Sequence, residues 1–208
     1  MRKTTIIDYG MGNINSIKNM LGYLGYESVL SNNPEVILKS KRIILPGVGN
    51  FGKAMENIRK LELDKILNDA VYEKRIPILG ICLGMQLLLS YSEEGNCNGL
   101  NFIPGKVKKF SSELIGDLKV PHMGWDYILE NNESLLINNL SDNPRFYFVH
   151  SYYAICDNNK NCIAKTDYGI KFDSIVNNGI VFGTQFHPEK SHKYGMKLLK
   201  NYMENIDV

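Results

Sequence analysis

Three short apolar runs in the first part of the chain are each followed by a glycine-containing break and then by a helix-type pattern. The runs are residues 4–8, 42–45 and 77–82, and the helix-type stretches are 14–25, 54–74 and 85–89; a further short strand is expected at 28–30. Runs of this length indicate buried strands, and spacings of three and four indicate amphipathic helices. Such alternation predicts a parallel sheet with helices on both faces.

The second half of the chain has a different pattern, of short strand-like segments joined by turn clusters. Short connections favour antiparallel pairing, and an amphipathic helix is expected at 194–204. No linker or repeat interrupts the 208 residues, so we expect a single domain over 1–208. The predicted fold is α/β, an open and mostly parallel sheet flanked by helices and extended by antiparallel strands. The strand-like segments are 106–110, 127–129, 146–149, 152–155, 163–166, 174–177 and 180–185.

Composition excludes several classes of protein. The chain has 24 basic and 22 acidic residues, whereas a nucleic-acid binder usually has a clustered basic excess. No segment approaches the roughly 20 apolar residues that span a membrane, and the apolar run that ends at Ile7 is too short for a signal peptide. The four cysteines form no C-x-x-C pair. We therefore expect a cytoplasmic chain with reduced thiols, in which a cysteine can serve as a nucleophile.

The strongest local motif is Gly80-Ile81-Cys82-Leu83-Gly84, which lies between a predicted strand and a predicted helix. This is the cysteine form of the nucleophile elbow. The glycines permit a sharp turn that presents Cys82 at the carboxyl end of the strand. The following helix N-terminus and backbone N–H groups favour a thiolate and an oxyanion. The alternative is a buried structural cysteine.

A cysteine nucleophile needs a base, and His187 is the best placed of the four histidines. It follows the strand-like segment 180–185, and Glu189 stands two residues later. In extended backbone two such side chains project to the same side. Glu189 is then able to orient one ring nitrogen and leave the other facing Cys82. The alternative is a surface His-Pro turn with a solvated glutamate.

A glycine-rich loop, Pro46-Gly47-Val48-Gly49, follows the predicted strand at 42–45. Glycines allow backbone to approach a ligand closely, so this loop is a candidate for a second oxyanion donor; the alternative is an ordinary strand-to-helix loop. The pair Gly10 and Gly12 lacks the third glycine of a dinucleotide fingerprint, because Asn15 stands there. No phosphate-binding G-x-x-x-x-G-K-[ST] motif is present either.

Taken together, these motifs resemble the class I (triad) glutamine amidotransferases. Segments along nearly the whole chain look like the glutaminase-subunit family of imidazole glycerol phosphate synthases, which make a histidine precursor. VPHMGW and FVHSYY are narrower signatures than the general triad. The segments are IIDYGMGNINS, LPGVGNFGKAM, PILGICLGMQLL, GLNFIPGKV, VPHMGWD, FYFVHSYY and FGTQFHPEKS.

The resemblance implies a Cys82-His187-Glu189 triad that hydrolyses glutamine to glutamate and ammonia without a metal or cofactor. Cys82 would attack the glutamine side-chain amide, His187 would protonate the departing ammonia, and Glu189 would orient His187. The implied oxyanion donors are Leu83 and the loop at Val48 and Gly49, where a peptide flip near Val48 is linked to partner and substrate binding. The implied glutamine-binding residues are Gly49, Gln86, Ser151 and Tyr152.

The family's partner is a (βα)8-barrel synthase subunit, which forms a heterodimer with the glutaminase and receives its ammonia through a protected route. Trp125 is the only tryptophan, and interfaces favour aromatic anchors; core packing is the alternative for it. His122 and His150 are expected to be structural, with no metal spacing between them. The implied partner-facing residues are Asn13, Asn15, Trp125, Tyr147 and Lys190.

One segment departs from the histidine-pathway pattern. After HPEKS the chain reads His192-Lys193-Tyr194-Gly195, which, with SEEGNCNGLNFIPG, resembles paralogues that supply ammonia to a surface-sugar (acetamidino sugar) amidotransferase. That alternative leaves the glutaminase chemistry unchanged but alters the partner and acceptor. Two other classes are a cysteine peptidase or deglycase-like protein, which would act without a partner, and a non-catalytic binding module.

Overall fold

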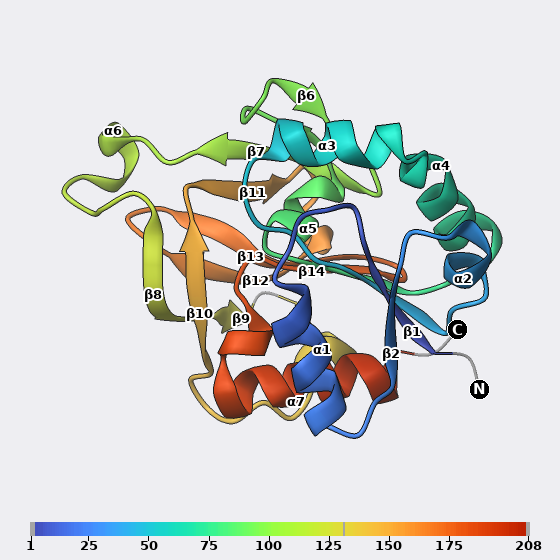
Figure 1. The fold of residues 1–208 in the computed structure, drawn as a ribbon. Coiled ribbons are helices and arrows are strands. Elements are labelled where there is room, and N and C mark those ends of the chain that lie inside the picture. The colour runs from blue at the N-terminus through green and yellow to red at the C-terminus, as the bar shows by residue number, and fades with distance from the viewer. Residues whose placement is uncertain (1–2, 131, 207–208) are drawn as a thin grey trace.

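A parallel block of five strands forms one side of a twelve-stranded sheet (Figure 1). The computed structural model describes residues 3–130 and 132–206. In spatial order the block contains β2 (Ser28–Ser31), β1 (Thr4–Ile7), β3 (Arg42–Leu45), β4 (Ile78–Ile81) and β14 (Val181–Thr184), each parallel to its neighbour. All residues of β1, β3, β4 and β14 are buried, as expected for strands covered on both faces.

Beyond β14 the sheet continues mainly with antiparallel pairing. β13 (Lys171–Asn178) pairs with β14 and β11 (Tyr152–Cys156), which pairs with β7 (Ile103–Lys109). β5 (Leu89–Ser92) then runs parallel to β7, and β6 (Cys97–Asn98) ends the row. β12 (Cys162–Asp167) joins β13 to β9 (Leu129–Glu130). A separate antiparallel ribbon consists of β8 (His122–Tyr127) and β10 (Arg145–His150).

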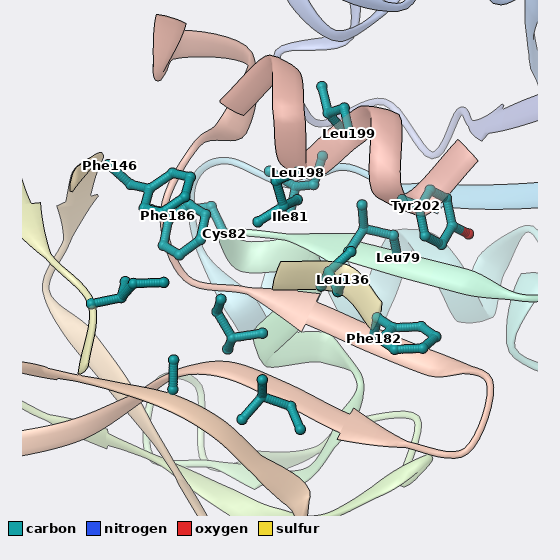
Figure 2. Close-up of a cluster of buried hydrophobic side chains, with 14 of the residues drawn as sticks. Leu79, Ile81, Cys82, Leu136, Phe146, Phe182, Phe186, Leu198, Leu199 and Tyr202 are labelled. Atoms are coloured by element: carbon teal, nitrogen blue, oxygen red, sulfur yellow. The ribbon is translucent and has the colours of Figure 1, made fainter. Parts of the chain in front are cut away.

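Helices cover both faces of the parallel block, and alternating strand residues supply the two cores. Ile6, Ile44 and Leu79 pack on the face covered by α1 (Ile14–Tyr23) and α7 (His192–Asn205). Figure 2 shows Leu79, Ile81 and Phe182 beneath Leu198, Leu199 and Tyr202 of α7. Their neighbours Ile7, Ile43 and Ile78 point the other way, toward α3 (Phe51–Lys60), α4 (Leu63–Asn68) and α5 (Leu83–Leu87). The shorter helical segments are α2 (Pro34–Leu38), α6 (Ser112–Ile115), a π-helical segment (Asp69–Glu73) and 3₁₀ turns at Leu135–Ile137, Asn159–Asn161 and Pro188–Lys190.

The predicted α/β architecture is confirmed, with local differences in its elements. The long helix expected at 54–74 is interrupted at Glu62, whose φ is 54°. The helix expected at 85–89 ends at Leu87, because Leu89 begins β5 opposite Ile103. The strand expected at 127–129 is divided between the ends of β8 and β9.

The sequence interpretation missed α2 altogether. Its start has a regular signal, since the Asn33 side chain accepts hydrogen bonds from the N–H groups of Glu35 and Val36, and Pro34 follows the cap. Within residues 3–130 and 132–206, none of the helices has both the length and the apolar character required to cross a membrane.

Candidate active site

Cys82 occupies a strained turn between β4 and α5. Its φ of 56° and ψ of −111° lie outside the usual regions for a side-chain-bearing residue. Hydrogen bonds on both sides hold this conformation: the Cys82 N–H donates to the Thr184 carbonyl (2.8 Å), and the Cys82 carbonyl accepts from the Gln86 N–H (3.2 Å). Strain of this kind is maintained where the surrounding structure fixes it, often at functional sites. The backbone at Cys82 therefore makes the sharp strand-to-helix turn that the predicted elbow requires.

The two glycines beside Cys82 are required by packing. A Cβ placed on Gly80 would lie 2.6 Å from the Gly84 carbonyl oxygen. A Cβ on Gly84 would overlap the Leu45 carbonyl of β3, with its carbon 2.8 Å away. Because these neighbours are backbone atoms, no rotamer change relieves the clash. The glycines thus allow α5 to begin directly against the sheet.

We expect Gly84→Ala to destabilise the protein by about 3 kcal/mol, at the upper end of overpacking costs, because the backbone of β3 must shift. The measurement is urea unfolding at equilibrium. Gly22→Ala is the matched control: Gly22 lies within α1, and a Cβ there would meet nothing within 4 Å. That control should be up to about 1 kcal/mol more stable, since alanine favours helix. Equal midpoints for the two variants would contradict the packing argument.

His187 and Glu189 form a buried pair just beyond β14. The His187 Nδ1 and Glu189 Oε1 atoms are 2.8 Å apart, and their side chains are 1% and 0% exposed. Asn13 donates to the same carboxylate oxygen at 3.3 Å. A carboxylate accepts, so Nδ1 carries a proton and the neutral ring has its lone pair at Nε2. Within the described residues, Nε2 has no hydrogen-bond partner, which leaves it available to a ligand.

The charge environment of His187 favours its protonated form. Burial alone would lower the pKa of His187, but the Cys82 and Glu189 side chains raise this pKa above its ordinary value. When Cys82 is a thiolate and Glu189 is a carboxylate, their negative charges stabilise an imidazolium. The arrangement therefore suits a thiolate–imidazolium pair held by a carboxylate.

Ser191 fixes the backbone of His187, a role that sequence patterns did not indicate. Its hydroxyl donates to the His187 carbonyl at 2.6 Å and accepts from the Tyr147 N–H at 3.0 Å. The His187 N–H in turn donates to the Tyr147 carbonyl at 2.9 Å. The histidine is thus tied to β10, the strand that borders the site on the other side.

Two further groups surround the thiol of Cys82. The Val149 carbonyl and the Gln185 side-chain amide each lie 3.9 Å from Sγ, the first as acceptor and the second as donor. Gln185 also accepts from the Gln86 Nε2 at 3.0 Å, and this nitrogen donates to the Tyr152 carbonyl at 2.9 Å. Gln86 therefore uses its amide N–H groups within the protein.

A cavity of about 300 Å³ opens over Cys82. It brings together residues from widely separated parts of the sequence, and its size is typical of small-molecule sites. The predicted residues that line it are Val48, Gly49, Cys82, Leu83, Gln86, Ser151, Tyr152 and His187. Its remaining lining residues, Glu94, Pro121, Val149 and His150, were not among the predicted site residues.

The glycine-rich loop forms one wall of the cavity and is held at both ends. Tyr9 donates its hydroxyl to the Pro46 carbonyl at 2.7 Å, and Glu94 accepts the Phe51 N–H at 2.8 Å. Between these anchors Val48 is 39% exposed, and Gly49 has a φ of 104° that favours glycine. The loop is therefore held by hydrogen bonds at both ends, and Gly49 between them allows backbone conformations that other residues rarely adopt.

Two of the predicted partner-facing residues, Trp125 and Tyr147, lie on the exposed face of the β8–β10 ribbon. We call Met123, Trp125, Tyr127 and Tyr147 the aromatic patch; the first three are 60%, 41% and 50% exposed. Trp125 faces Tyr147 across the ribbon, and the Lys190 Nζ lies 5.8 Å from the Tyr147 ring centroid. Trp125 is therefore at the surface and is not packed in the core.

Arg145 and His192 border this patch. The Arg145 guanidinium lies 5.7 Å from the Trp125 ring, and the His192 ring stacks on Trp125 with centroids 5.5 Å apart. Asn15 is exposed at the start of α1, and Asn13 reaches Glu189 as described above. The patch is thus linked to His187 through Tyr147 of β10, whereas Asn13 links Glu189 to the start of α1.

Comparison with known proteins gives one family. The model of the family "Glutamine amidotransferase class-I" matches residues 5–206. "Imidazole glycerol phosphate synthase subunit HisH 2" of Methanococcus maripaludis is 50% identical over 199 residues, covering 96% of this chain and 98% of that protein. The HisH subunit of Bacillus mycoides is 46% identical, with 98% of this chain and 95% of that protein covered. That of Leptospira interrogans is 43% identical, with coverages of 95% and 97%.

Solved structures share the fold at low sequence identity. PurLQS from Thermotoga maritima superposes with a TM-score of 0.73 at 17% identity, and 99% of each chain is covered. A glutamine amidotransferase structure gives 0.71 at 17% identity, with 96% of this chain and 97% of that chain covered. These likenesses establish the architecture independently of the sequence relatives.

Proposed function

The chain belongs to the class I glutamine amidotransferases, with HisH-type relatives along its whole length, and on that premise we propose that it is the glutaminase subunit of an imidazole glycerol phosphate synthase. It hydrolyses glutamine and delivers the ammonia to a (βα)8-barrel synthase subunit in histidine biosynthesis. The observation that carries the proposal is the single cavity that joins Cys82 to the buried His187–Glu189 pair. A non-catalytic module has no need of this arrangement.

In the first half-reaction, the Cys82 thiolate attacks the side-chain amide carbon of glutamine. The resulting oxyanion is held by the N–H of Leu83 and by the loop at Val48 and Gly49. The His187 imidazolium then gives its Nε2 proton to the amide nitrogen, the C–N bond breaks, and ammonia leaves a glutamyl thioester on Cys82.

In the second half-reaction, the neutral Nε2 of His187 takes a proton from water as the water oxygen attacks the thioester. The Cys82 thiolate leaves and restores the thiolate–imidazolium pair. The product acid gives one proton to solvent as it departs as glutamate, so protons balance over the cycle. Glu189 keeps the proton of His187 at Nδ1 throughout, and Asn13 holds the carboxylate in place. No metal or cofactor takes part in these steps.

The cavity wall supplies groups suited to glutamine. Gln86 already uses its N–H groups on Tyr152 and Gln185, which leaves its carbonyl oxygen to accept from the α-ammonium group. Gly49 allows the ligand to approach backbone, and Ser151 and Tyr152 close the opposite wall. These four residues are the proposed glutamine site.

The aromatic patch is the proposed docking surface for the barrel subunit, together with Asn13, Asn15 and Lys190. A contiguous exposed set of large side chains bordered by cations is typical of an interaction site. Docking there would seal the route for ammonia, which otherwise becomes ammonium in water and loses the lone pair needed for attack. We place this reaction in the cytoplasm and assign residues 1–208 to one amidotransferase domain.

The test is genetic complementation with the chain and the barrel subunit from its own genome. A histidine auxotroph lacking its glutaminase subunit should grow without histidine when both are expressed, and it should not grow with the barrel alone. Failure of the pair to restore growth, with rescue of a strain defective in surface-sugar amidation, would assign the chain to the alternative pathway. In either outcome, glutamine hydrolysis by the purified complex tests the glutaminase chemistry separately.

A further inference from the structure

His122 and His150 form a buried hydrogen-bonded pair behind the glutamine cavity. The His122 Nδ1 and His150 Nε2 atoms are 3.1 Å apart, and the residues are 3% and 6% exposed. The other nitrogen of His150, Nδ1, lies 2.8 Å from the Tyr152 carbonyl. The other nitrogen of His122, Nε2, lies 3.3 Å from the Asp126 carboxylate. The chain of contacts therefore ends in an acceptor on each side.

This pattern fixes the proton positions along the two hydrogen bonds. A carbonyl only accepts, so Nδ1 of His150 carries a proton. Because burial keeps His150 neutral, its Nε2 has a lone pair and accepts from the Nδ1–H of His122.

The surroundings hold the His122 ring in place. It stacks against the rings of Phe148 and Tyr168, with centroids 4.9 Å and 3.9 Å away. The Asp126 carboxylate, which is only partly buried, lies beyond its Nε2. Burial lowers the pKa of His150 to about 3, and the neighbouring charges of His122 and His187 act in the same direction. The titratable groups facing the pair are thus Asp126, Tyr168 and His187.

His150 connects the pair to the site through one carbonyl group. The Tyr152 carbonyl accepts from both His150 and Gln86, and each of these side chains lines the cavity. A carbonyl with two donors is fixed in direction, and Ser151, the residue just before β11, also lies at the cavity wall. At the other end of the pair, Asp126 neighbours Trp125 of the aromatic patch in β8.

We propose that His122 and His150 are positioning residues for glutamine: His122, which lies beside Asp126, donates to a neutral His150 that in turn fixes the Tyr152 carbonyl at the cavity wall. This inference rests on the proposed glutaminase function and assigns a role to two histidines that the sequence pattern treated as structural. It also joins the docking surface to the glutamine site through four consecutive contacts.

Two substitutions of His150 separate its two hydrogen bonds. In His150→Asn, the new amide lies near the position of Nδ1, so the hydrogen bond to the Tyr152 carbonyl is retained and the one to His122 is lost. In His150→Gln, the longer side chain reaches the position of Nε2, so the hydrogen bond to His122 is retained and the one to Tyr152 is lost. In the complex with the barrel subunit, we expect His150→Gln to raise the glutamine KM at least tenfold, equivalent to one hydrogen bond of about 1.4 kcal/mol. His150→Asn should raise it several-fold less, with kcat changing less than KM in both.

The proton positions are measured directly by imidazole ¹H–¹⁵N spectra of the complex at pH 7. We expect a proton on Nδ1 of His122, and His150 neutral with its proton at Nδ1. Asp64→Asn, which changes a partly buried carboxylate in α4, is the control and should leave both the spectrum and the KM unchanged.

Equal KM values for the two His150 variants, or a His150 proton at Nε2, would overturn the proposal. Loss of thermal stability in both variants without a difference in KM would assign the pair a structural role and would overturn it as well. If the wild-type complex hydrolyses no glutamine, the glutaminase proposal fails, while the imidazole spectrum still decides the proton positions on the pair.

Discussion

Cys82→Ala is expected to abolish glutamine-dependent synthesis by the complex, with a loss of at least about 10³-fold, while synthesis from added ammonia continues. The reason is that the covalent route through a thioester requires the sulfur, and the remaining residues of such a unit give little hydrolysis without it. The acceptor reaction takes place on the barrel subunit and needs only ammonia. The measurement is product formation with glutamine or with an ammonium salt at a pH that supplies free ammonia.

Cys97→Ala is the matched control for this experiment. Cys97 lies in β6, is partly exposed, and is absent from the residues that line the cavity. Burial raises the pKa of its thiol, so it is a poor nucleophile. The control should keep both activities and still be labelled at Cys82 by a glutamine-analogue alkylating agent. Glutamine hydrolysis that persists in Cys82→Ala would remove Cys82 from the mechanism.

Glu189→Gln should reduce glutamine hydrolysis by about 10²- to 10⁴-fold with little change in structure. The carboxylate holds the Nδ1 proton of His187 at 2.8 Å and is one of the groups that raise the pKa of His187. A neutral amide removes that charge and can present an N–H to Nδ1, which forces the ring proton to Nε2. His187 then has the wrong tautomer to accept a proton from water.

The same variant gives a pH signature whose sign follows from the charges. In the wild type the negative Glu189 favours the imidazolium, and the imidazolium favours the Cys82 thiolate. Without that charge, the thiolate–imidazolium pair forms less readily at neutral pH. The midpoint of Cys82 alkylation against pH should therefore move to higher pH. Glu73→Gln, an exposed carboxylate of the π-helical segment, is the control and should leave the midpoint unchanged; the same midpoint in Glu189→Gln would show that Glu189 does not act through His187.

Local sequence signals were sufficient wherever neighbours in the chain decide the outcome. The elbow at Cys82 is an example, because Gly80 and Gly84 mark a turn that only a short strand-to-helix connection requires. The proximity of Glu189 to His187 followed likewise from a spacing of two residues in extended backbone. The α2 helix was missed although Asn33 and Pro34 carry its start signal, because its five residues are too few to show a helical period.

Contacts between distant segments set the limit of what could be predicted. β14 was expected to pair in antiparallel fashion after its short turn, and it does so with β13. Its other edge, however, pairs in parallel with β4, which lies about a hundred residues earlier, and this pairing brings His187 to Cys82. No local pattern specifies such a partner, since it depends on which buried edges remain open when the sheet assembles.

The sequence by itself determined the α/β class, the nucleophile elbow and the chemical types of the site residues, because each follows from periodicity or from glycine geometry over a few residues. Only the tertiary structure decided that Gln185 and Val149 surround the thiol, that Ser191 ties His187 to β10, and that His122 and His150 form a hydrogen-bonded pair beside Asp126. Those contacts join residues 28 to 103 positions apart, or depend on burial that no local pattern reveals. These contacts form because β8, β10 and β14 lie around the end of β4. Water is excluded there, so an unpaired buried polar group is costly and must find its hydrogen-bond partner within the protein.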